Sequence, residues 1–394
     1  MEPRSDNASY RIMVFTWNTE SISLSETLDV SVAREHRKSG SSYVPGMTTW
    51  RHEGEIPDFL PALLSFIRDK DPDLVVIGFQ EDRYPGSYFH SHLLPQEFGK
   101  EGYGMLKRTK LMGVGVTTYK GILKGDLFER GIRVSIYTKE KLKSLIEKEE
   151  TELRAVIGND GQEEYVCSSP LTRGKGATVS YVLLPGVGRV AFICCHLPFN
   201  GKSLLEERKY SNRMIRQTDL NECNGCFNKI IESLVVFKSP TPTHVIYFGD
   251  FNYRVSSQSG ASSVAKQLIE NRKDREYLNS VYKSHDELLD QMNKGNIYQF
   301  MEGVDGKGPD FLPTCKMVKG RMKDALPVTY DRVWKTGKED QRIPSWCDRI
   351  LYTTTEGVDE KLRKIACNFY DRFDEGTAMS KSDHAGVLCV LDIS

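Results

Sequence analysis

The sequence predicts an α/β fold in which helices cover a layered β-sheet. Apolar runs such as 74–79 and 245–248 have the continuous hydrophobic pattern of strands that are buried on both faces. Segments with helical spacing of apolar residues, such as 58–70, lie between these runs. No internal repeat and no Pro- or Gly-rich linker divides the 394 residues. We therefore expect a single domain over residues 1–394, with its core at about 11–393.

The first elements illustrate the pattern. A predicted strand at 11–18 is followed by a Ser-rich segment, 20–54, that we expect to be a long loop. The helix at 58–70 has Asp58 as a plausible N-cap, and Pro61 lies in its first turn, where a missing N–H costs little.

The later elements alternate in the same way. Pro185–Gly188 is a good hairpin signal between two strands, whereas 150–174 has no clear period and is expected to be a surface insertion. The other predicted strands are 73–81, 111–119, 130–137, 177–184, 189–195, 349–354 and 385–393, and the other predicted helices are 139–149, 203–237 (one helix or two), 262–272 and 284–294.

The charge balance of the chain argues against a nucleic acid partner. Lys plus Arg and Asp plus Glu both number 54, so the formal net charge is zero. Proteins that bind duplex nucleic acid usually carry a basic surplus, so we expect no nucleic acid partner.

Nine cysteines are scattered along the chain, several of them inside apolar runs. This pattern favours reduced thiols in a cytoplasmic compartment over a disulfide framework. Cys223-x-x-Cys226 is the one closely spaced pair, and it lacks the two further ligands that a zinc site needs.

No segment indicates insertion into a membrane. The N-terminus lacks the apolar core of a signal peptide, no uncharged run is long enough to span a bilayer, and the last residues carry no prenylation signal. We expect a cytoplasmic monomer, with any membrane contact peripheral. Lys107–Gly113 could supply that contact, or it could be an ordinary strand entry with solvated lysines.

Polar residues stand where several predicted strands begin or end. Each one alone could be an ordinary strand cap, but together they are restricted to Asn, Glu, His and Asp. Layered α/β proteins build their sites from such residues at one sheet edge. They are Asn18, Glu81, His196, Asp250 with Asn252, Asp348, and Asp383 with His384.

The types of these residues predict phosphoester chemistry. Asp250 and Asn252 are two residues apart, so both side chains can face one water molecule or phosphate. Glu81 with the Asn18 amide forms a hard-oxygen site suited to Mg²⁺. A metal, a base and two histidines fit direct attack of water on phosphorus.

The motifs that contain these residues resemble the DNase I-like metallophosphoesterase superfamily, and more specifically the inositol polyphosphate 5-phosphatases. The resemblance spans about Ile12 to Asp392. It is carried by Thr16-Trp-Asn18, Phe79-Gln-Glu81, His196-Leu197, Gly249-Asp-Phe-Asn-Tyr-Arg254, Pro313-Thr-Cys-Lys316, Arg342-Ile-Pro-Ser-Trp-Cys-Asp-Arg-Ile-Leu351 and Ser382-Asp-His384.

The resemblance implies a DNase I-like four-layer α/β sandwich, in which two central mixed β-sheets pack face to face and are flanked by helices. It also implies a Mg²⁺-dependent phosphatase that removes the 5-phosphate from inositol polyphosphates or phosphoinositides.

The resemblance implies a role for each catalytic position. Glu81 would bind Mg²⁺ with support from Asn18. Asp250 would orient and deprotonate the attacking water, and Asn252 would fix that water or a phosphate oxygen. The scissile phosphate would accept hydrogen bonds from two histidines, and Asp383 would organise the metal side. These histidines are His196 and His384, the second oriented by Asp348.

The resemblance also implies cations for the substrate phosphates, namely Lys175, Lys316, Arg342 and Arg349. Two departures from the family pattern bear on the neighbouring 4-phosphate: Cys315 stands where a Tyr is common, and Asp340 where a Lys is common. A carboxylate beside a phosphate is repulsive, so this contact is expected to be weaker, or to be supplied by Lys335, Lys338 or another group. His196-Leu-Pro-Phe199 also departs from the family's His-Leu-Ala-Ala.

Two other functions stay open at this point. One is another enzyme of the superfamily, such as an endonuclease, and the other is a binding module without catalysis. The sequence does not distinguish a soluble inositol phosphate from a membrane lipid as the preferred substrate.

Overall fold

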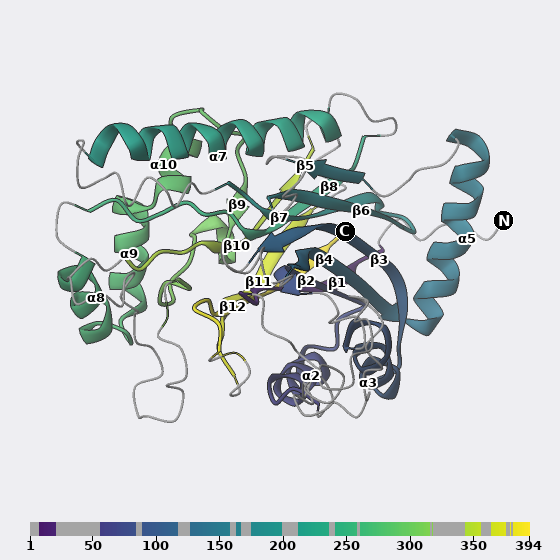
Figure 1. The fold of residues 1–394 in the computed structure, drawn as a ribbon. Helices are drawn as coiled ribbons and strands as arrows, with labels where there is room; N and C mark the ends of the chain where they lie inside the picture. Colours follow the sequence, from purple (N-terminus) through teal and green to yellow (C-terminus); the bar gives the residue numbers. More distant parts are fainter. Residues whose placement is uncertain are drawn as a thin grey trace, which may run out of the picture.

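Two six-stranded sheets form the centre of the computed structural model (Figure 1). The structure describes residues 8–20, 56–83, 89–116, 127–157, 163–166, 175–198, 212–235, 241–257, 261–315, 317, 343–355, 364–375, 379 and 381–394. The expected loop at 20–54 lies outside these residues except for Glu20.

The first sheet has the strand order β11-β12-β1-β2-β4-β3. Its central pair, β1 and β2, is parallel, and its other neighbours are antiparallel. The strands are β1 (Tyr10–Asn18), β2 (Leu74–Arg83), β3 (Tyr103–Val116), β4 (Leu127–Lys139), β11 (Ile365–Phe373) and β12 (Gly386–Ile393).

The second sheet repeats this arrangement with the order β5-β6-β7-β8-β10-β9. Here β7 and β8 form the parallel pair. The strands are β5 (Glu163–Val166), β6 (Gly176–Leu184), β7 (Gly188–His196), β8 (His244–Asp250), β9 (Met301–Glu302) and β10 (Asp348–Thr354). Both sheets are therefore mixed, as expected.

Helices cover the outer faces of the two sheets, with α7 over one and α2 and α3 over the other (Figure 1). The helices are α2 (Phe59–Lys70), η1 (Phe89–Leu93), α3 (Leu94–Lys100), α5 (Glu140–Ile157), α7 (Asn212–Val235), α8 (Ala261–Glu270), α9 (Arg275–His285), α10 (Glu287–Asn293) and η2 (Val304–Gly306).

Strand alternation explains the layers. Along β1, Ile12 and Val14 face the second sheet and join the apolar cluster between the sheets. Met13, Phe15 and Trp17 point the other way, into the cluster under α2 and α3. A third cluster lies between the second sheet and α7. The expected four-layer sandwich is confirmed.

Two element predictions need correction. The segment 150–174 is not wholly an insertion, because α5 extends to Ile157 and β5 pairs with β6. For 203–237, where one helix or two were expected, a single helix, α7, occupies the described part. The helix predicted at 284–294 is in fact two, because Asp286 has an extended backbone and caps α10 through its side chain. Long-range pairing and local caps decide these cases.

The cysteines are mostly buried free thiols. Among the described residues, seven cysteines form no disulfide: Cys194, Cys195, Cys223, Cys315, Cys347, Cys367 and Cys389. Cys226 is disulfide-bonded, which corrects the expectation of reduced thiols alone. Cys223 and Cys226 lie on the buried side of α7.

The segment Lys107–Gly113 lies within β3. Lys107 forms an ion pair with Glu150 at 2.6 Å.

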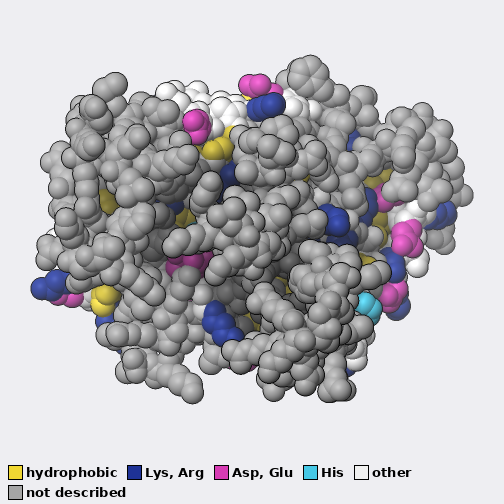
Figure 2. All heavy atoms as spheres, in the orientation of Figure 1, with side chains coloured by type: hydrophobic (Ala, Val, Ile, Leu, Met, Phe, Trp, Pro, Cys, Tyr) yellow, Lys and Arg dark blue, Asp and Glu magenta, His cyan; other side chains and the backbone are white. Residues whose placement is uncertain are grey.

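None of the described helices is long and apolar enough to cross a membrane. Basic and acidic side chains are interspersed among the described residues on the face shown in Figure 2, in keeping with the zero net charge.

The close approach of the two sheets at Gly78 gives a stability prediction. A Cβ there would lie 2.5 Å from the Phe248 ring and 2.7 Å from Cys194 Sγ, whereas one at Gly99 would meet nothing within 4 Å. We expect Gly78→Ala to lower the free energy of unfolding by about 1–3 kcal/mol through overpacking. Gly99→Ala, in α3, should leave it unchanged or raise it slightly. Urea unfolding of both variants tests this, and equal midpoints would contradict the sheet spacing.

Candidate active site

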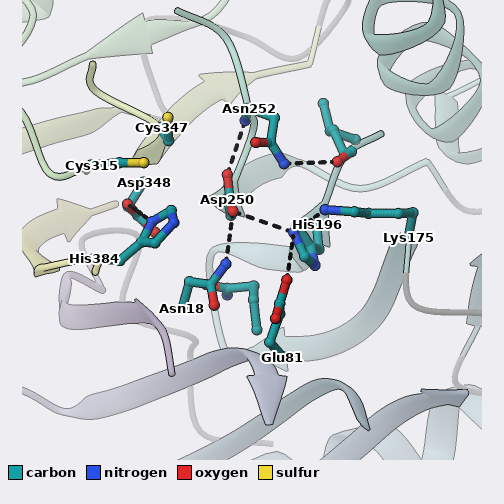
Figure 3. Close-up of polar contacts among 12 residues, drawn as sticks. Asn18, Glu81, Lys175, His196, Asp250, Asn252, Cys315, Cys347, Asp348 and His384 are labelled. Atoms are coloured by element: carbon teal, nitrogen blue, oxygen red, sulfur yellow. Dashed lines mark hydrogen bonds and ion pairs between the residues drawn. The ribbon is translucent and has the colours of Figure 1, made fainter. Parts of the chain in front are cut away.

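The polar strand ends predicted from the sequence meet at one edge of the two sheets (Figure 3). In the second sheet the strand register places His196 beside Asp250, and Asp250 beside Asp348. In the first sheet Asn18 pairs with Gln80, next to Glu81. Residues far apart in sequence therefore converge because they share a position at the strand ends.

Asp250 is the centre of this group. Its Oδ2 accepts a hydrogen bond from Asn18 Nδ2 at 2.8 Å and lies 3.3 Å from His196 Nε2, while its Oδ1 accepts from the Asn252 backbone N–H at 3.0 Å. Burial alone would raise the pKa of Asp250, but His196, His384 and Lys175 hold it well below the usual value. The carboxylate is therefore ionised at neutral pH.

The backbone around Asp250 has an unusual path. Gly249 has a φ of 131°, and a Cβ there would lie 2.1 Å from the Cys195 carbonyl oxygen. Only glycine fits this position. Asn252 has a left-handed φ of 58°, which Asn tolerates better than most residues.

The Asn252 side chain is fixed by the protein at both ends. Its Nδ2 donates to the Leu197 carbonyl at 3.0 Å, and its Oδ1 accepts from the Arg254 guanidinium at 2.8 Å. Arg254 also donates to Cys315 Sγ at 3.5 Å. No role was predicted for Arg254, although its place in the Asn-Tyr-Arg motif could have pointed to one.

His196 connects the two sheets across the site. Its Nε2 lies 3.8 Å from Glu81 Oε1 and also contacts Lys175 Nζ. Burial, followed by the positive charge of Lys175, lowers the pKa of His196. His196 is therefore a neutral imidazole at neutral pH.

His384 forms a buried dyad with Asp348. The His384 Nδ1 to Asp348 Oδ2 distance is 2.8 Å, and Thr314 Oγ1 donates to the same carboxylate oxygen at 2.7 Å. Burial lowers the pKa of His384, but Asp348 outweighs it and raises the pKa well above the usual value. His384 is thus held as a cation, and Thr314 is a supporting residue that the sequence analysis missed.

Asp383 lies on the same side as the Asn18 strand end. Its Oδ1 is 3.5 Å from His384 Nε2, and its backbone N–H donates to Glu20 Oε2 at 3.0 Å. Ser382 Oγ donates to the Asn18 carbonyl at 2.7 Å. These bonds attach the last strand to β1.

The residues predicted to bind the substrate phosphates have different locations in the structure. Lys175 is at the site, beside His196. Lys316, Arg342 and the departure at Asp340 lie outside the described residues. Cys315 is fully buried and pairs through its backbone with Ser345 and His384.

Arg349 does not bind substrate, which corrects the prediction. Its side chain is fully buried, and its guanidinium donates to both carboxylate oxygens of Asp286 and of Glu302 and to the Trp346 carbonyl. An arginine has five N–H donors, and these five bonds use all of them. Its motif position beside Asp348 was misleading because neighbours on a strand face opposite ways.

The site offers a donor set that suits a hard divalent cation. The carboxylates of Asp250 and Asp348 bring ligand oxygens within 4.8 Å of one another. Asp348 Oδ1 is buried without a hydrogen-bond partner, and Glu81 adds another carboxylate nearby. Carboxylate and amide oxygens are the ligands that Mg²⁺ prefers, so the residues present fit such an ion.

Comparisons with known proteins define the class. The sequence matches the Endonuclease/Exonuclease/phosphatase family 2 over residues 15–390, and the chain belongs to this family. It is similar to type IV inositol polyphosphate 5-phosphatase 11 of Arabidopsis thaliana, with 28% identity over 228 residues. The match covers 57% of this chain and 54% of that relative, so the chain spans about half of the relative's length.

Two solved structures share the DNase I-like fold. One is the inositol polyphosphate 5-phosphatase domain of SPsynaptojanin with inositol (1,4)-bisphosphate and a calcium ion, at TM-score 0.53 and 18% identity, covering 98% of this chain and 84% of that one. The other is a Cimex nitrophorin ferrous NO complex, at TM-score 0.55 and 14% identity, covering 98% and 99%. Because a nitrophorin shares the fold, the site residues must carry the argument for function.

The Arg349 cluster gives a pH prediction. Burial raises the pKa of Asp286 to about 6 from 3.8, although Arg349 opposes this shift. Between these values the folded protein holds a proton that the unfolded chain releases. Asp286 therefore contributes stability that is complete only below its unfolded pKa of 3.8 and is lost as the pH rises to about 6.

Asp286→Asn removes this titration and keeps a good helix N-cap. We expect the unfolding free energy of the wild type, minus that of the variant, to fall by roughly 3 kcal/mol between about pH 4 and pH 7. Urea unfolding across this range measures the difference. A difference that stays constant, or rises with pH, would contradict the raised pKa.

Proposed function

We propose that this protein is a Mg²⁺-dependent phosphatase that removes the 5-phosphate from inositol polyphosphates or phosphoinositides. The observation that carries the proposal is the convergence of Asp250, His196 and the His384–Asp348 dyad at one sheet edge. The family assignment and the similarity to a 5-phosphatase support the choice of reaction.

Asp250 is proposed to orient the attacking water. Its hydrogen bonds from Asn18 and Asn252 fix the direction of the carboxylate. A carboxylate with a low pKa is a weak base, so orientation of the water is its larger contribution, with proton acceptance as the reaction proceeds.

The histidines and Lys175 are proposed to stabilise the phosphoryl group. Negative charge grows on the phosphoryl oxygens in the transition state, and donors placed there in advance stabilise it. His384 would donate from Nε2, because its Nδ1 is held by Asp348. His196 and Lys175 would act from the opposite side of Asp250.

Glu81, with support from Asn18, is proposed to hold the Mg²⁺ ion, and Asp383 to organise the metal side. When bound, the ion would supply positive charge to the phosphoryl oxygens. The carboxylates of Asp250 and Asp348, which have ligand oxygens within 4.8 Å of one another, would repel each other less beside such an ion.

Further parts of the proposal concern substrate and setting. Lys316 and Arg342 are proposed to hold the neighbouring ring phosphate. We also propose that the protein acts as a cytoplasmic monomer, with peripheral membrane contact when the substrate is a lipid. The zero net charge gives no long-range attraction to anionic membranes.

The test is phosphate release from soluble inositol 1,4,5-trisphosphate and from vesicles containing phosphatidylinositol 4,5-bisphosphate, with Mg²⁺ and with excess chelator. We expect release that the chelator abolishes and that Asp250→Asn lowers by about 10²–10⁴-fold. Asp305→Asn, at an exposed turn, is the matched control and should keep full activity.

Other outcomes would replace the proposal. Plasmid nicking without phosphate release would indicate an endonuclease of the same family. Binding of inositol phosphates without metal and without turnover would indicate a binding module. The ratio of rates on the two substrates distinguishes a soluble head group from a membrane lipid.

A further inference from the structure

β2 carries an extra residue immediately before it reaches the site. Phe79 pairs with Arg133 of β4, and Asp82 pairs with Gly131, so three steps along β2 match two along β4. This is a β-bulge. Within it, Glu81 has a left-handed φ of 52°, which non-glycine residues rarely adopt.

The bulge changes the direction in which Glu81 points. Phe79 faces outward, into the aromatic cluster under α2 and α3. In a regular strand Glu81, two residues later, would face the same way and be placed under the helices. Instead its Oε1 lies 3.8 Å from His196 Nε2, which belongs to the other sheet (Figure 3). Glu81 therefore reaches the site because of the bulge.

Asp82 takes the outward direction and is held there from two sides. Its Oδ2 accepts from Arg133 Nε at 2.6 Å, and its Oδ1 lies 3.2 Å from His90 Nε2. All three residues are at most 4% exposed. A shift of the bulge would break both contacts. It would leave a buried carboxylate without partners, which is strongly destabilising.

The two partners span the bulge. Arg133 is the register partner of Phe79, the last regularly paired residue before it. His90, in η1, bonds to Asp82 after the bulge and packs edge-on against the Phe79 ring, with centroids 5.2 Å apart. The arrangement therefore joins both ends of the bulge to β4 and η1.

We propose that Asp82, held by Arg133 and His90, is a positioning residue that fixes the bulge in β2 and so aims Glu81 at a divalent cation. The identity of the cation rests on the proposed function. Outer partners of metal ligands typically change metal affinity by about 10–100-fold when they are replaced. Asp82 acts in this way through the backbone that it shares with Glu81.

The test measures metal binding directly as well as activity. Asp82→Asn keeps the size of the side chain and weakens its bond to Arg133. We expect Mn²⁺ binding, followed by electron paramagnetic resonance, to weaken by about 10-fold or more. The Mg²⁺ concentration for half-maximal phosphate release should rise by a similar factor, with activity recovering at high Mg²⁺. Glu81→Gln sets the upper limit of the effect.

His90→Phe is the second variant, in case Asp82→Asn does not fold. It keeps a ring against Phe79 and loses only the bond to Asp82, so we expect a smaller loss of Mn²⁺ affinity in the same direction. Ile146→Ala is the control for stability alone, because Ile146 is fully buried in α5, which packs against β3 and β6.

The results separate positioning from simple stabilisation. If Asp82→Asn, or His90→Phe in its place, lowers the thermal midpoint as Ile146→Ala does but leaves Mn²⁺ affinity unchanged, the inference is overturned. If the wild type binds Mn²⁺ but releases no phosphate, the proposed function fails, and the loss of Mn²⁺ binding in the variants still decides the inference.

Discussion

The hydrogen bond from Asn18 to Asp250 is the contact on which the rest of the site depends. It joins the end of β1 in one sheet to the end of β8 in the other, at 2.8 Å. Asp250 is 1% exposed, and a buried carboxylate is stable only when its oxygens are satisfied. The contact therefore fixes how the two sheets meet at this edge. Two histidines then lie around Asp250. His196 is its register neighbour on β7, and His384 belongs to the dyad with Asp348.

Unusual backbone geometry is concentrated at the same edge. Gly249 allows β7 and β8 to approach closely, while Glu81 and Asn252 both have positive φ. Such conformations are unfavourable alone, and they persist where surrounding contacts over-determine them. Asn252 is held by Arg254 and Leu197, and the bulge that contains Glu81 is flanked by the Asp82 cluster. Rigid strands supply the positions, and local departures from regular geometry supply the directions.

Two buried arginines have different partners and different consequences. Arg349 lies between Asp286 and Glu302, so all its donors serve the packing of β10 against β9 and the start of α10. Arg133 has one carboxylate partner, Asp82, next to a residue of the site. Breaking a buried ion pair is strongly destabilising, but the presence of such a pair is weak evidence that it adds net stability. Each buried ion pair instead specifies one geometry. Arg133 does so next to the active site, and Arg349 does so in the packing behind it.

The sequence alone determined the fold class, most strands, and which residue types meet at the site, because buried strands have continuous apolar patterns and their polar ends must share an edge. The strand-end pattern brought Asn18, Glu81, His196, Asp250, Asp348 and His384 to one location, and the family resemblance added Lys175. The sequence could not show that Arg349 is enclosed, that Thr314 and Arg254 support the site, or that 284–294 divides at Asp286. The enclosure of Arg349 and the support from Thr314 depend on partners tens of residues away, whereas the division at Asp286 follows from a local cap. The direction of Glu81 is a further case, since only the register between β2 and β4 reveals the extra residue that turns it.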